Sequence, residues 1–405
     1  MREYKISFIG DVVEEYPVLR EAKLPDGSYD FYPSLAPLAG LLADSDYSIA
    51  NLETNLGGED AGYTKDIFSF NTPDSIVDAL KAIGITAVTT ANNHMMDRGQ
   101  EALFRTVRVL DEKGMAHTGT YDEIPEDKNL YFTLGDTKVA LLSYATTANY
   151  ASNKKYDFNG IYDHANFLRP YDSPLMRAPE HPSVKETMNF VQDLLGRKLT
   201  FEEKAQLRHT MHRPVAFGDD VADREEMEPF LERLLSDYKK ARRKADVVIV
   251  CPHSGGQFNV EPGEVSKYYF ERMAQMGFDA VVASHSHTTQ RVEKKGGTVV
   301  ANCLGNVTMS PMTGYMSSVM ETLPAYGMVL HIYVGDKKMT RIGFSLFKAV
   351  QDETHPLRVI PVCELLSSLP EGDEKEILTS EIAAVYKRIS GKEMTEISDE
   401  WPLEV

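Results

Sequence analysis

The feature that most constrains the fold of this chain is a repeated pairing of a short apolar run with a polar residue directly after it. The runs have the length and the Val, Ile and Ala content of buried β-strands. Stretches with apolar residues at helical spacing separate them. The runs are 4–9, 46–52, 85–90, 139–144, 246–251, 279–283 and 298–301. This alternation of strand and helix predicts an α/β fold.

The helical stretches and one hairpin complete this expected core. Gly335-Asp336 lies between two segments, 327–334 and 338–347, in which apolar and polar residues alternate, which is typical of a β-hairpin. Helices are expected at Pro33–Ala43, Gln100–Lys113, Glu226–Lys244 and Glu264–Met276, and one is expected to start at Thr72-Pro73.

Two regions depart from this pattern. Residues 146–238 are polar and rich in Tyr, Asn and Pro, with helical patterns at 184–195 and 200–211. We interpret 146–238 as an insertion that forms a lid or cap. After about residue 350 the chain is acidic and helical in pattern. The expected organisation is one domain over 1–350 that carries the insertion, followed by an acidic helical extension over 351–405.

Composition and charge exclude several classes of protein. The formal net charge of the 405-residue chain is −18, which argues against nucleic acid as the main partner, because no basic surface would release counterions from phosphates. No apolar run is long enough to span a bilayer, and the N-terminus lacks the pattern of a signal peptide. The three cysteines are far apart and odd in number. We therefore expect a cytoplasmic protein without a disulfide framework.

The residues that follow the apolar runs are of the types that bind metal ions. They are Asp11, Glu53, Asn93, His94, His253, His285 and His287. Because strand ends meet at one edge of an α/β sheet, we expect these side chains to lie together. Carboxylate, imidazole and amide ligands without thiols suit Mn, Fe or Zn. About six ligands are too many for one tetrahedral ion and fit two ions that share a carboxylate. One or two divalent ions are therefore the expected cofactors.

The segment Ala91–Gly99 is the most polar of these strand ends. It gathers two amides, an imidazole, a carboxylate and a guanidinium within a few residues. Such a group at a strand end indicates a binding or catalytic role. Arg98 is either a clamp for a substrate phosphate or carboxylate or a solvated side chain. Asn302 and Asn306, after the last apolar run, are candidates for substrate contacts or turn formers.

The ordered motifs resemble those of the CapA-like family, which is associated with capsule and poly-γ-glutamate synthesis. That family belongs to the calcineurin-like metallophosphoesterase superfamily. The motifs that carry the resemblance are Gly10-Asp11, Asn51-Leu52-Glu53, Asn92-Asn93-His94 with Asp97 and Gly99, His253-Ser254-Gly255, and Ser284-His285-Ser286-His287. The resemblance covers residues 1 to about 350. It implies an α/β (α+β) fold in which two mixed sheets form a four-layer αββα sandwich.

The resemblance also implies roles for these residues. Asp11 and His287 would hold a first ion, and Asn93, His253 and His285 a second. Glu53 stands where the superfamily has its bridging aspartate. His94 resembles the general acid for the leaving oxygen, with Asp97 holding its ring through the other nitrogen.

Three positions depart from the superfamily pattern. Val13 stands where the first motif usually has a histidine ligand. Met95 stands where an acid usually follows the catalytic histidine, so that Asp97 is its substitute. Ser284 stands where glycine is commoner.

The function expected from these residues is metal-dependent hydrolysis of a phosphoester. The expected substrate is a small phosphoester or an anionic polymer. One alternative is an enzyme that acts on the amide bonds of a γ-glutamyl polymer. The other is a catalytically degenerate protein that binds a polymer or a partner in capsule assembly.

Overall fold

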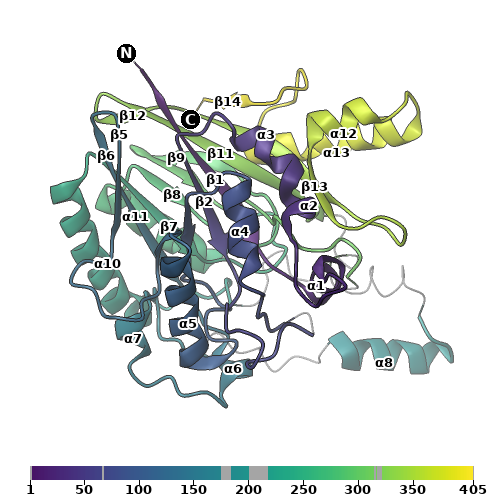
Figure 1. Ribbon diagram of the computed structural model, residues 1–405, viewed down its shortest axis with the longest axis horizontal. Coiled ribbons are helices and arrows are strands. Elements are labelled where there is room, and N and C mark those ends of the chain that lie inside the picture. The colour runs from purple at the N-terminus through teal and green to yellow at the C-terminus, as the bar shows by residue number, and fades with distance from the viewer. Residues whose placement is uncertain are drawn as a thin grey trace.

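The computed structural model describes residues 2–65, 68–174, 184–199, 218–313, 316 and 322–404. Two mixed sheets and the helices around them make up the fold (Figure 1). Among the described residues the larger sheet has eight strands in the order β13-β12-β11-β1-β2-β3-β4, with β14 also paired to β12. The smaller sheet has six described strands in the order β5-β6-β7-β8-β10-β9.

The strands of the larger sheet are β1 (Tyr4–Val12), β2 (Tyr47–Leu52), β3 (Ala87–Thr89), β4 (Ala116–Thr118), β11 (Tyr326–Gly335), β12 (Lys338–Val350), β13 (Arg358–Pro361) and β14 (Trp401–Leu403). Those of the smaller sheet are β5 (Leu130–Leu134), β6 (Thr137–Ala145), β7 (Val247–His253), β8 (Ala280–Val282), β9 (Val292–Lys295) and β10 (Thr298–Ala301). Each of the seven apolar runs in the sequence overlaps one of these strands.

The helices are α1 (Tyr16–Ala22), α2 (Tyr32–Leu35), η1 (Ala36–Leu38), α3 (Ala39–Leu42), α4 (Ser75–Ala82), α5 (Gly99–Glu112), α6 (Tyr150–Asn153), α7 (Ile161–His164), α8 (Val184–Leu195), α10 (Arg224–Lys244), α11 (Glu264–Met276), α12 (Val362–Ser368) and α13 (Asp373–Ser390). The helix expected over 33–43 is broken into α2, η1 and α3. Pro37 lies at the break, and its ring and missing N–H do not fit an uninterrupted helix.

The two sheets pack face to face over a continuous apolar core. Phe8 and Ile49 from the larger sheet and Leu141 and Ile249 from the smaller one are all less than 3% exposed and belong to one cluster. Leu80 of α4 belongs to a second cluster outside the larger sheet, and helices α10 and α11 pack in a third outside the smaller sheet. The chain is therefore a four-layer αββα sandwich, as expected.

Parallel pairing decides where the polar strand ends lie. In the larger sheet β1, β2, β3 and β4 are parallel neighbours. In the smaller sheet β6, β7, β8 and β10 are also parallel. The carboxyl ends of each set meet at one sheet edge, which is where α/β folds place their ligands.

The expected hairpin is present as β11 and β12. Asp336 and Lys337, which connect the two strands, have φ angles of 51° and 62°. Positive φ at both central residues is typical of a type I′ turn, whose twist matches that of the two strands. The hairpin holds β1 through antiparallel pairing with β11.

The segment 351–405 is more closely integrated than a helical extension. It contains the helices α12 and α13, and also β13 and β14, which were not expected and which extend the larger sheet by pairing with β12. Leu378 and Ile382 of α13 join the core between the sheets. Figure 1 shows α12 and α13 beside β13, at the end of the larger sheet. The strands β13 and β14 were not predicted, because short edge strands carry few apolar residues and leave no long apolar run in the sequence.

The segment expected as an insertion, 146–238, contains several distinct parts. Helices α6 and α7 pack with the core, whereas α8 covers the expected range 184–195 and lies apart from the other helices in Figure 1. The helix expected at 200–211 lies outside the described residues. Helix α10 begins at Arg224, so the boundary at 238 was placed inside a helix of the outer layer.

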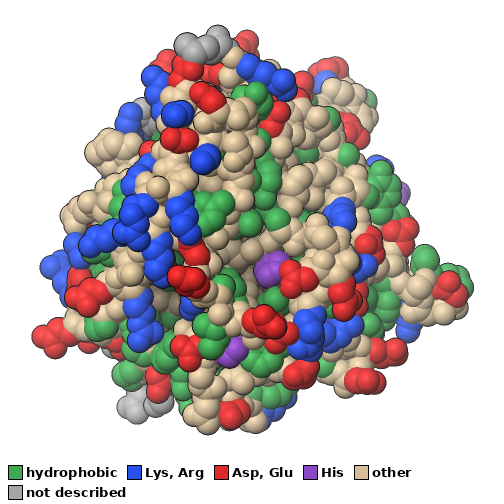
Figure 2. Space-filling model, turned by 60° about the vertical axis from the view of Figure 1, so that its left-hand side comes forward, with side chains coloured by type: hydrophobic (Ala, Val, Ile, Leu, Met, Phe, Trp, Pro, Cys, Tyr) green, Lys and Arg blue, Asp and Glu red, His purple; other side chains and the backbone are tan. Residues whose placement is uncertain are grey.

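The surface balances much of its charge locally. Figure 2 shows Lys and Arg side chains interspersed with Asp and Glu on one face. Pairs such as Arg242 with Asp279 and Lys244 with Asp127, whose nitrogen–oxygen distances are 2.5 Å, illustrate the pattern. Such exposed pairs contribute little to stability. Within the described part of the chain, no helix is both long and apolar enough to cross a membrane.

Truncation of Trp401 tests whether the C-terminal strand belongs to the core. Its ring lies 5.4 Å from that of Phe344 and 5.6 Å from that of Tyr386, and its indole nitrogen donates to the Glu396 carbonyl. We expect Trp401→Ala to lower the free energy of unfolding by about 3–5 kcal/mol in urea denaturation. Ile397→Ala, at a more exposed position, is the control and should cost less than about 1 kcal/mol. Equal losses would contradict the packing.

Candidate active site

The polar strand ends of both sheets converge on one point. Asp11 lies near the end of β1 and Glu53 directly follows β2, while His253 ends β7. His285 and His287 lie in the loop after β8. These residues form two groups whose ligand atoms all lie within 4.8 Å of one another: Glu53 with His253 and His285, and Asp11 with Glu53 and His287. The five residues predicted from separate strand ends therefore meet.

Gly10 allows β1 to approach the loop that contains Gly305. A Cβ on Gly10 would lie 1.8 Å from the carbonyl oxygen of Gly305. Because Gly10 has no side chain, the Asp11 backbone N–H reaches that carbonyl at 3.0 Å. The pairing of β1 with β2 also shifts register between Phe8 and Asp11, an irregularity that re-aims the strand end.

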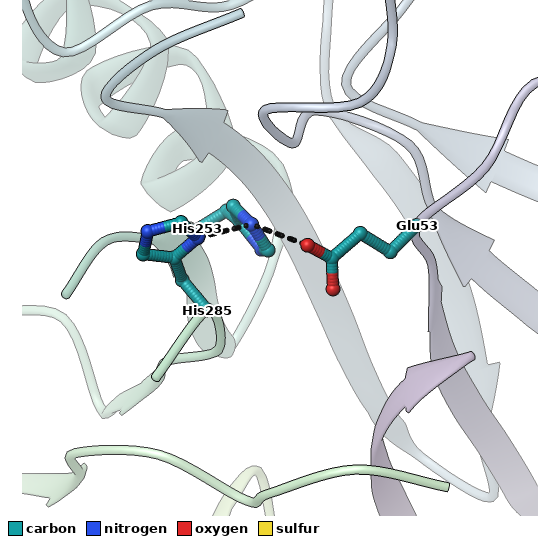
Figure 3. A group of neighbouring side chains, drawn as sticks. All are labelled: Glu53, His253 and His285. Atoms are coloured by element: carbon teal, nitrogen blue, oxygen red, sulfur yellow. Dashed lines mark hydrogen bonds and ion pairs between the residues drawn. The ribbon is translucent and has the colours of Figure 1, made fainter. Parts of the chain in front are cut away.

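The first group brings two imidazole nitrogens and two oxygens together. Nε2 of His253 lies 3.2 Å from Oε1 of Glu53, 3.0 Å from Nδ1 of His285 and 2.7 Å from Oδ1 of Asn93. Figure 3 shows Glu53 pointing across the site toward the two histidines. Burial lowers the pKa of His253 to about 3 and that of His285 well below its ordinary value. Both rings are therefore neutral and offer lone pairs, as metal binding requires.

The second group is more strongly charged. Burial alone would raise the pKa of Asp11, but the hydrogen bond to His287 and the charge of His287 hold it at about 2. Burial alone would lower the pKa of His287, and the charges of Glu53 and Asp11 raise it to about 9. The two buried acids thus favour the charged form of the imidazole beside them.

Glu53 belongs to both groups and accepts no hydrogen bond from the described residues. The residue is fully buried, and neither carboxylate oxygen has a hydrogen-bond partner in the described part of the chain. Burial raises its pKa to about 8, and the charge of Asp11 adds to that rise. A buried carboxylate without hydrogen bonds is costly unless a cation pairs with it. The donor set therefore fits divalent cations.

Polar neighbours fix the orientation of the ligands. Asn51 donates to Oδ1 of Asp11 at 2.7 Å, and Nδ1 of His253 lies 2.8 Å from Oγ of Ser284. Nδ1 of His287 lies 2.7 Å from Oδ1 of Asn306. A proton on each Nδ1 leaves Nε2 free as the ligand atom, the usual arrangement around metal-bound histidine.

The loop that carries His285 and His287 has unusual backbone angles. The φ angles of these two residues are 108° and 54°. Non-glycine residues rarely adopt positive φ, and the cost of order 1–3 kcal/mol is usually found at functional sites. The backbone conformation turns the two rings toward the groups that Glu53 joins.

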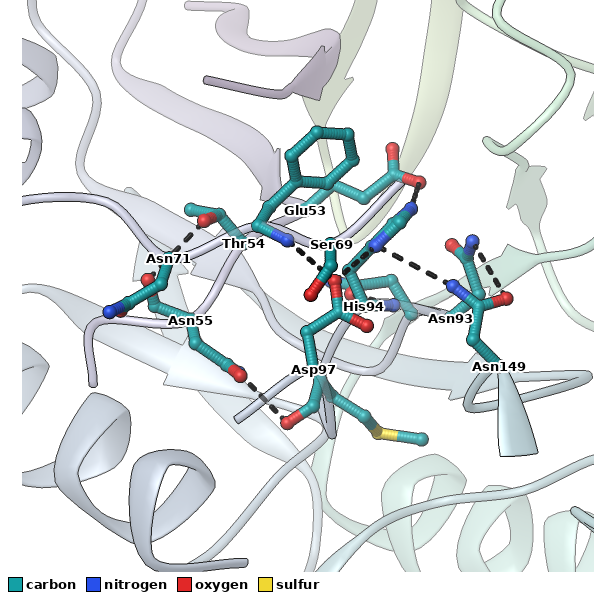
Figure 4. Close-up of polar contacts among 12 residues, drawn as sticks. Glu53, Thr54, Asn55, Ser69, Asn71, Asn93, His94, Asp97 and Asn149 are labelled. Atoms are coloured by element: carbon teal, nitrogen blue, oxygen red, sulfur yellow. Dashed lines mark hydrogen bonds and ion pairs between the residues drawn. The ribbon is translucent and has the colours of Figure 1, made fainter. Parts of the chain in front are cut away.

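His94 and Asp97 lie beside the first group. Nδ1 of His94 is 2.6 Å from Oδ2 of Asp97, and its Nε2 is 3.8 Å from Oε1 of Glu53 (Figure 4). Burial tends to lower the pKa of His94, but the charge of Asp97 and the hydrogen bond to it raise the pKa above its ordinary value. The ring of Phe70 packs against the imidazole at 4.3 Å. His94 is therefore held with Nε2 toward the centre.

The three residues expected to contact substrate have other contacts. The Arg98 guanidinium donates to the carbonyls of Gly62 and Asp97, both at 3.0 Å, and to the Ser69 hydroxyl. It thereby ties Gly62 and Ser69 to the loop that carries His94. Asn306 is buried against His287. Asn302 lies at the end of β10, and its amide nitrogen is 3.4 Å from Oε1 of Glu293 on β9.

Sequence reasoning missed four residues that support the site. Asn51 and Ser284 lie within the quoted motifs, so a search for partners of the ligands would have found them. Asn149 and Asn153 follow β6 in the region interpreted as a lid. Asn149 lies 3.4 Å from Asn93 and 3.5 Å from Nδ1 of His94 (Figure 4). No apolar run directly precedes these two asparagines, so the strand-end pattern did not mark them.

Comparisons with known proteins match most of this chain to one family. Residues 5–310 match the model of the family described as bacterial capsule synthesis protein PGA_cap. An uncharacterized protein, y4sH, from Sinorhizobium fredii (strain NBRC 101917 / NGR234) is 26% identical over 305 residues, which cover 68% of this chain and 61% of that protein. The capsule biosynthesis protein CapA of Bacillus anthracis is 21% identical over 65% of this chain and 51% of its own length.

Two further comparisons are more limited. The PGA biosynthesis protein CapA of Bacillus subtilis (strain 168) is 31% identical over 67 residues, 16% of this chain and 18% of that protein. Among solved structures, a 5′-nucleotidase from Candida albicans SC5314 aligns with 96% of this chain and 59% of its own, at a TM-score of 0.38 and 10% identity. The chain spans about three-fifths of the length of the first relatives. By the match over residues 5–310, this chain belongs to the bacterial capsule synthesis protein PGA_cap family.

Proposed function

We propose that this chain is a metal-dependent phosphoester hydrolase with two divalent cations at the edge where its sheets meet. The observation that carries the proposal is the buried Glu53 carboxylate, which has no hydrogen-bond partner among the described residues and is shared by two ligand groups. Without cations, this carboxylate next to Asp11 would be strongly unfavourable.

The two sites would have different ligand sets. Glu53, Asn93, His253 and His285 would hold one ion, and Asp11, Glu53 and His287 the other. Nitrogen and oxygen donors of this kind suit Mn, Fe or Zn. A pair of such cations supplies charge stabilisation for the phosphoryl oxygens and lowers the pKa of the attacking water.

Val13 accounts for the difference between the two sites. It is fully buried, and its backbone N–H donates to Oγ of Thr308 at 2.8 Å. Because valine has no donor atom, the site with Asp11 and His287 has three protein ligands and the other has four. We infer that the three-ligand site binds its cation more weakly.

His94, oriented by Asp97, would donate a proton to the leaving group. Asp97 accepts the proton on Nδ1 of His94, so that the imidazolium form is stabilised and Nε2 faces the centre. From there Nε2 can donate its proton to the leaving oxygen of the ester. General acid catalysis by a positioned histidine accelerates such steps by roughly 10²–10⁴-fold.

Cations would also explain how an acidic protein binds an anionic substrate. With a net charge of −18, the chain repels phosphates at long range. Divalent ions are the largest local charges in a site of this kind and reverse the local sign. A phosphoester is therefore attracted by the centre itself.

Metal analysis of the variant Glu53→Gln tests the shared carboxylate. We expect the wild type, purified without chelator, to retain Mn, Fe or Zn by plasma mass spectrometry, and Glu53→Gln to lose most of it. Glu14→Gln is the matched control, because Glu14 is also fully buried, lacks hydrogen-bond partners among the described residues and belongs to neither ligand group. Equal metal content in the two variants would rule out Glu53 as the bridge.

The stability of the metal-free protein should depend on the same carboxylate. Burial raises the pKa of Glu53 from an ordinary 4.5 to about 8. The folded protein then binds this proton more tightly than the unfolded chain, so the associated stability is full below about pH 4.5 and is lost as pH rises toward 8. In chelator, wild type should lose stability relative to Glu53→Gln over this range, by on the order of a few kcal/mol in urea denaturation. A pH-independent difference would contradict the assignment.

Removal of the His94 imidazole tests catalysis separately from metal binding. We expect His94→Ala to lower kcat on a phosphoester by roughly 10²–10⁴-fold with metal content unchanged. His355→Ala is the control, because His355 also pairs with an aspartate three residues away, at 2.8 Å, but is exposed. If His94→Ala and wild type behaved alike in every activity assay, a catalytically degenerate binding protein would be the better account.

The names of two relatives support a second candidate function. They are described as CapA proteins of PGA biosynthesis and of capsule biosynthesis. A centre that stabilises oxyanion charge can also polarise an amide carbonyl. Incubation with poly-γ-glutamate, followed by gel analysis of chain length, tests it. Shortening or extension that requires the metal and His94 would favour this candidate over phosphoester hydrolysis.

A further inference from the structure

The segment that follows β6, which begins at Thr146, contacts residues of the candidate site. The amide N–H and hydroxyl of Thr146 approach the carbonyl oxygen of His253 at 3.1 and 3.2 Å. Helix α6 begins four residues later, and its neighbour Ala148 packs in one apolar cluster with Met95 and Met96. The start of the region interpreted as a lid is thus fixed between a metal ligand and the His94 loop.

Asn153, at the end of α6, contacts the carboxylate that holds His94. Its Nδ2 donates to Oδ1 of Asp97 at 3.1 Å. The other oxygen, Oδ2, accepts from Nδ1 of His94 and, at 2.7 Å, from the backbone N–H of Phe70. Asn153 and Asp97 are 3% and 2% exposed, so water does not replace these contacts. The carboxylate is held through both of its oxygens.

Asn153 is itself held in place. Its Nδ2 lies 3.3 Å from the carbonyl oxygen of Ala148, and its backbone N–H donates to the carbonyl of Asn149 at 3.1 Å. Asn149 has a φ angle of 49°, a conformation that asparagine tolerates better than most residues. The tight turn at Asn149 therefore directs the Asn153 amide toward Asp97.

We propose that Asn153 is a positioning residue for the proposed reaction, because it fixes the plane of the Asp97 carboxylate that orients His94. The inference rests on the proposed function. Without the Asn153 donor, the Asp97 carboxylate is held through Oδ2 alone, by His94 and the Phe70 N–H, so that its plane is less fixed and the His94 ring can tilt with it. Nε2 then points toward the leaving oxygen for a smaller fraction of the time. The effect concerns proton donation and not metal binding.

Substrates with different leaving groups separate this role from a structural one. Nitrophenolate leaves without a proton, whereas phenolate benefits more from one. We expect Asn153→Ala in manganese-loaded protein to lower kcat roughly tenfold on phenyl phosphate and less than about twofold on 4-nitrophenyl phosphate, with KM and metal content unchanged. Asn153→Asp, which sets a second carboxylate against Asp97, should be at least as impaired on phenyl phosphate. Ser152→Ala, exposed on the same helix, should match wild type.

The outcomes distinguish failure of the proposal from failure of the proposed function. Equal losses on both substrates, or a loss in Ser152→Ala equal to that in Asn153→Ala, would overturn the positioning role while leaving the hydrolase intact. Wild-type protein inactive on both substrates would overturn both. The comparison uses the full chain and requires only that the variants fold, as judged by circular dichroism.

A second readout does not depend on activity. In metal-free protein, the melting temperatures of Asn153→Ala, Asp97→Asn and the double variant form a thermodynamic cycle. The proposal predicts that the second substitution lowers the melting temperature much less once the first is present. Asn153→Ser in place of Asn153→Ala repeats the cycle with a smaller loss of packing. Additive shifts in both cycles would show that Asn153 does not act on Asp97.

Discussion

The site depends on one electrostatic constraint: Glu53 and Asp11 are carboxylates in a place that water does not reach. Both residues are fully buried, and Glu53 has no hydrogen-bond donor among the described residues. Three imidazoles and an amide oxygen face the same point, and two of the imidazoles are held neutral by burial. Bound cations would stabilise such an arrangement, and without them it would destabilise the fold.

The arrangement of the two sheets brings these carboxylates together and buries them. Parallel strands of both sheets end at a common edge, and the core between the sheets excludes water beneath it. Gly10 lets β1 approach the Gly305 loop, and positive φ angles at His285 and His287 turn their rings inward. The fold therefore gathers residues that are more than 270 positions apart, as in the contact of the His285 N–H with Asp11 at 3.2 Å.

The strand-end pattern predicted the α/β fold and the meeting of the candidate ligands, because both depend on strand position, and the resemblance to the CapA-like family implied the four-layer sandwich. An apolar run followed by Asp11, Glu53 or His253 marks a strand end whatever the rest of the chain does. Features that depend on tertiary contacts were not predictable. The edge strand β14 has three residues, and Pro37 splits a helix whose apolar spacing is otherwise regular.

Asn153 is an ordinary polar residue in sequence, and only the turn at Asn149 brings it to Asp97. Arg98 was expected to be a substrate clamp or a solvated side chain, but Gly62 and Ser69 occupy its guanidinium.

The central claim is that two cations flank Glu53, and anomalous diffraction from crystals grown without chelator tests it most directly. Data collected on both sides of the absorption edge of the bound metal should give two peaks about 3.5–4 Å apart. One should lie among Glu53, Asn93, His253 and His285, and the other among Asp11, Glu53 and His287, with lower occupancy at the second. Crystals soaked in Mn²⁺ that show no anomalous peak within either group of ligands would contradict the account.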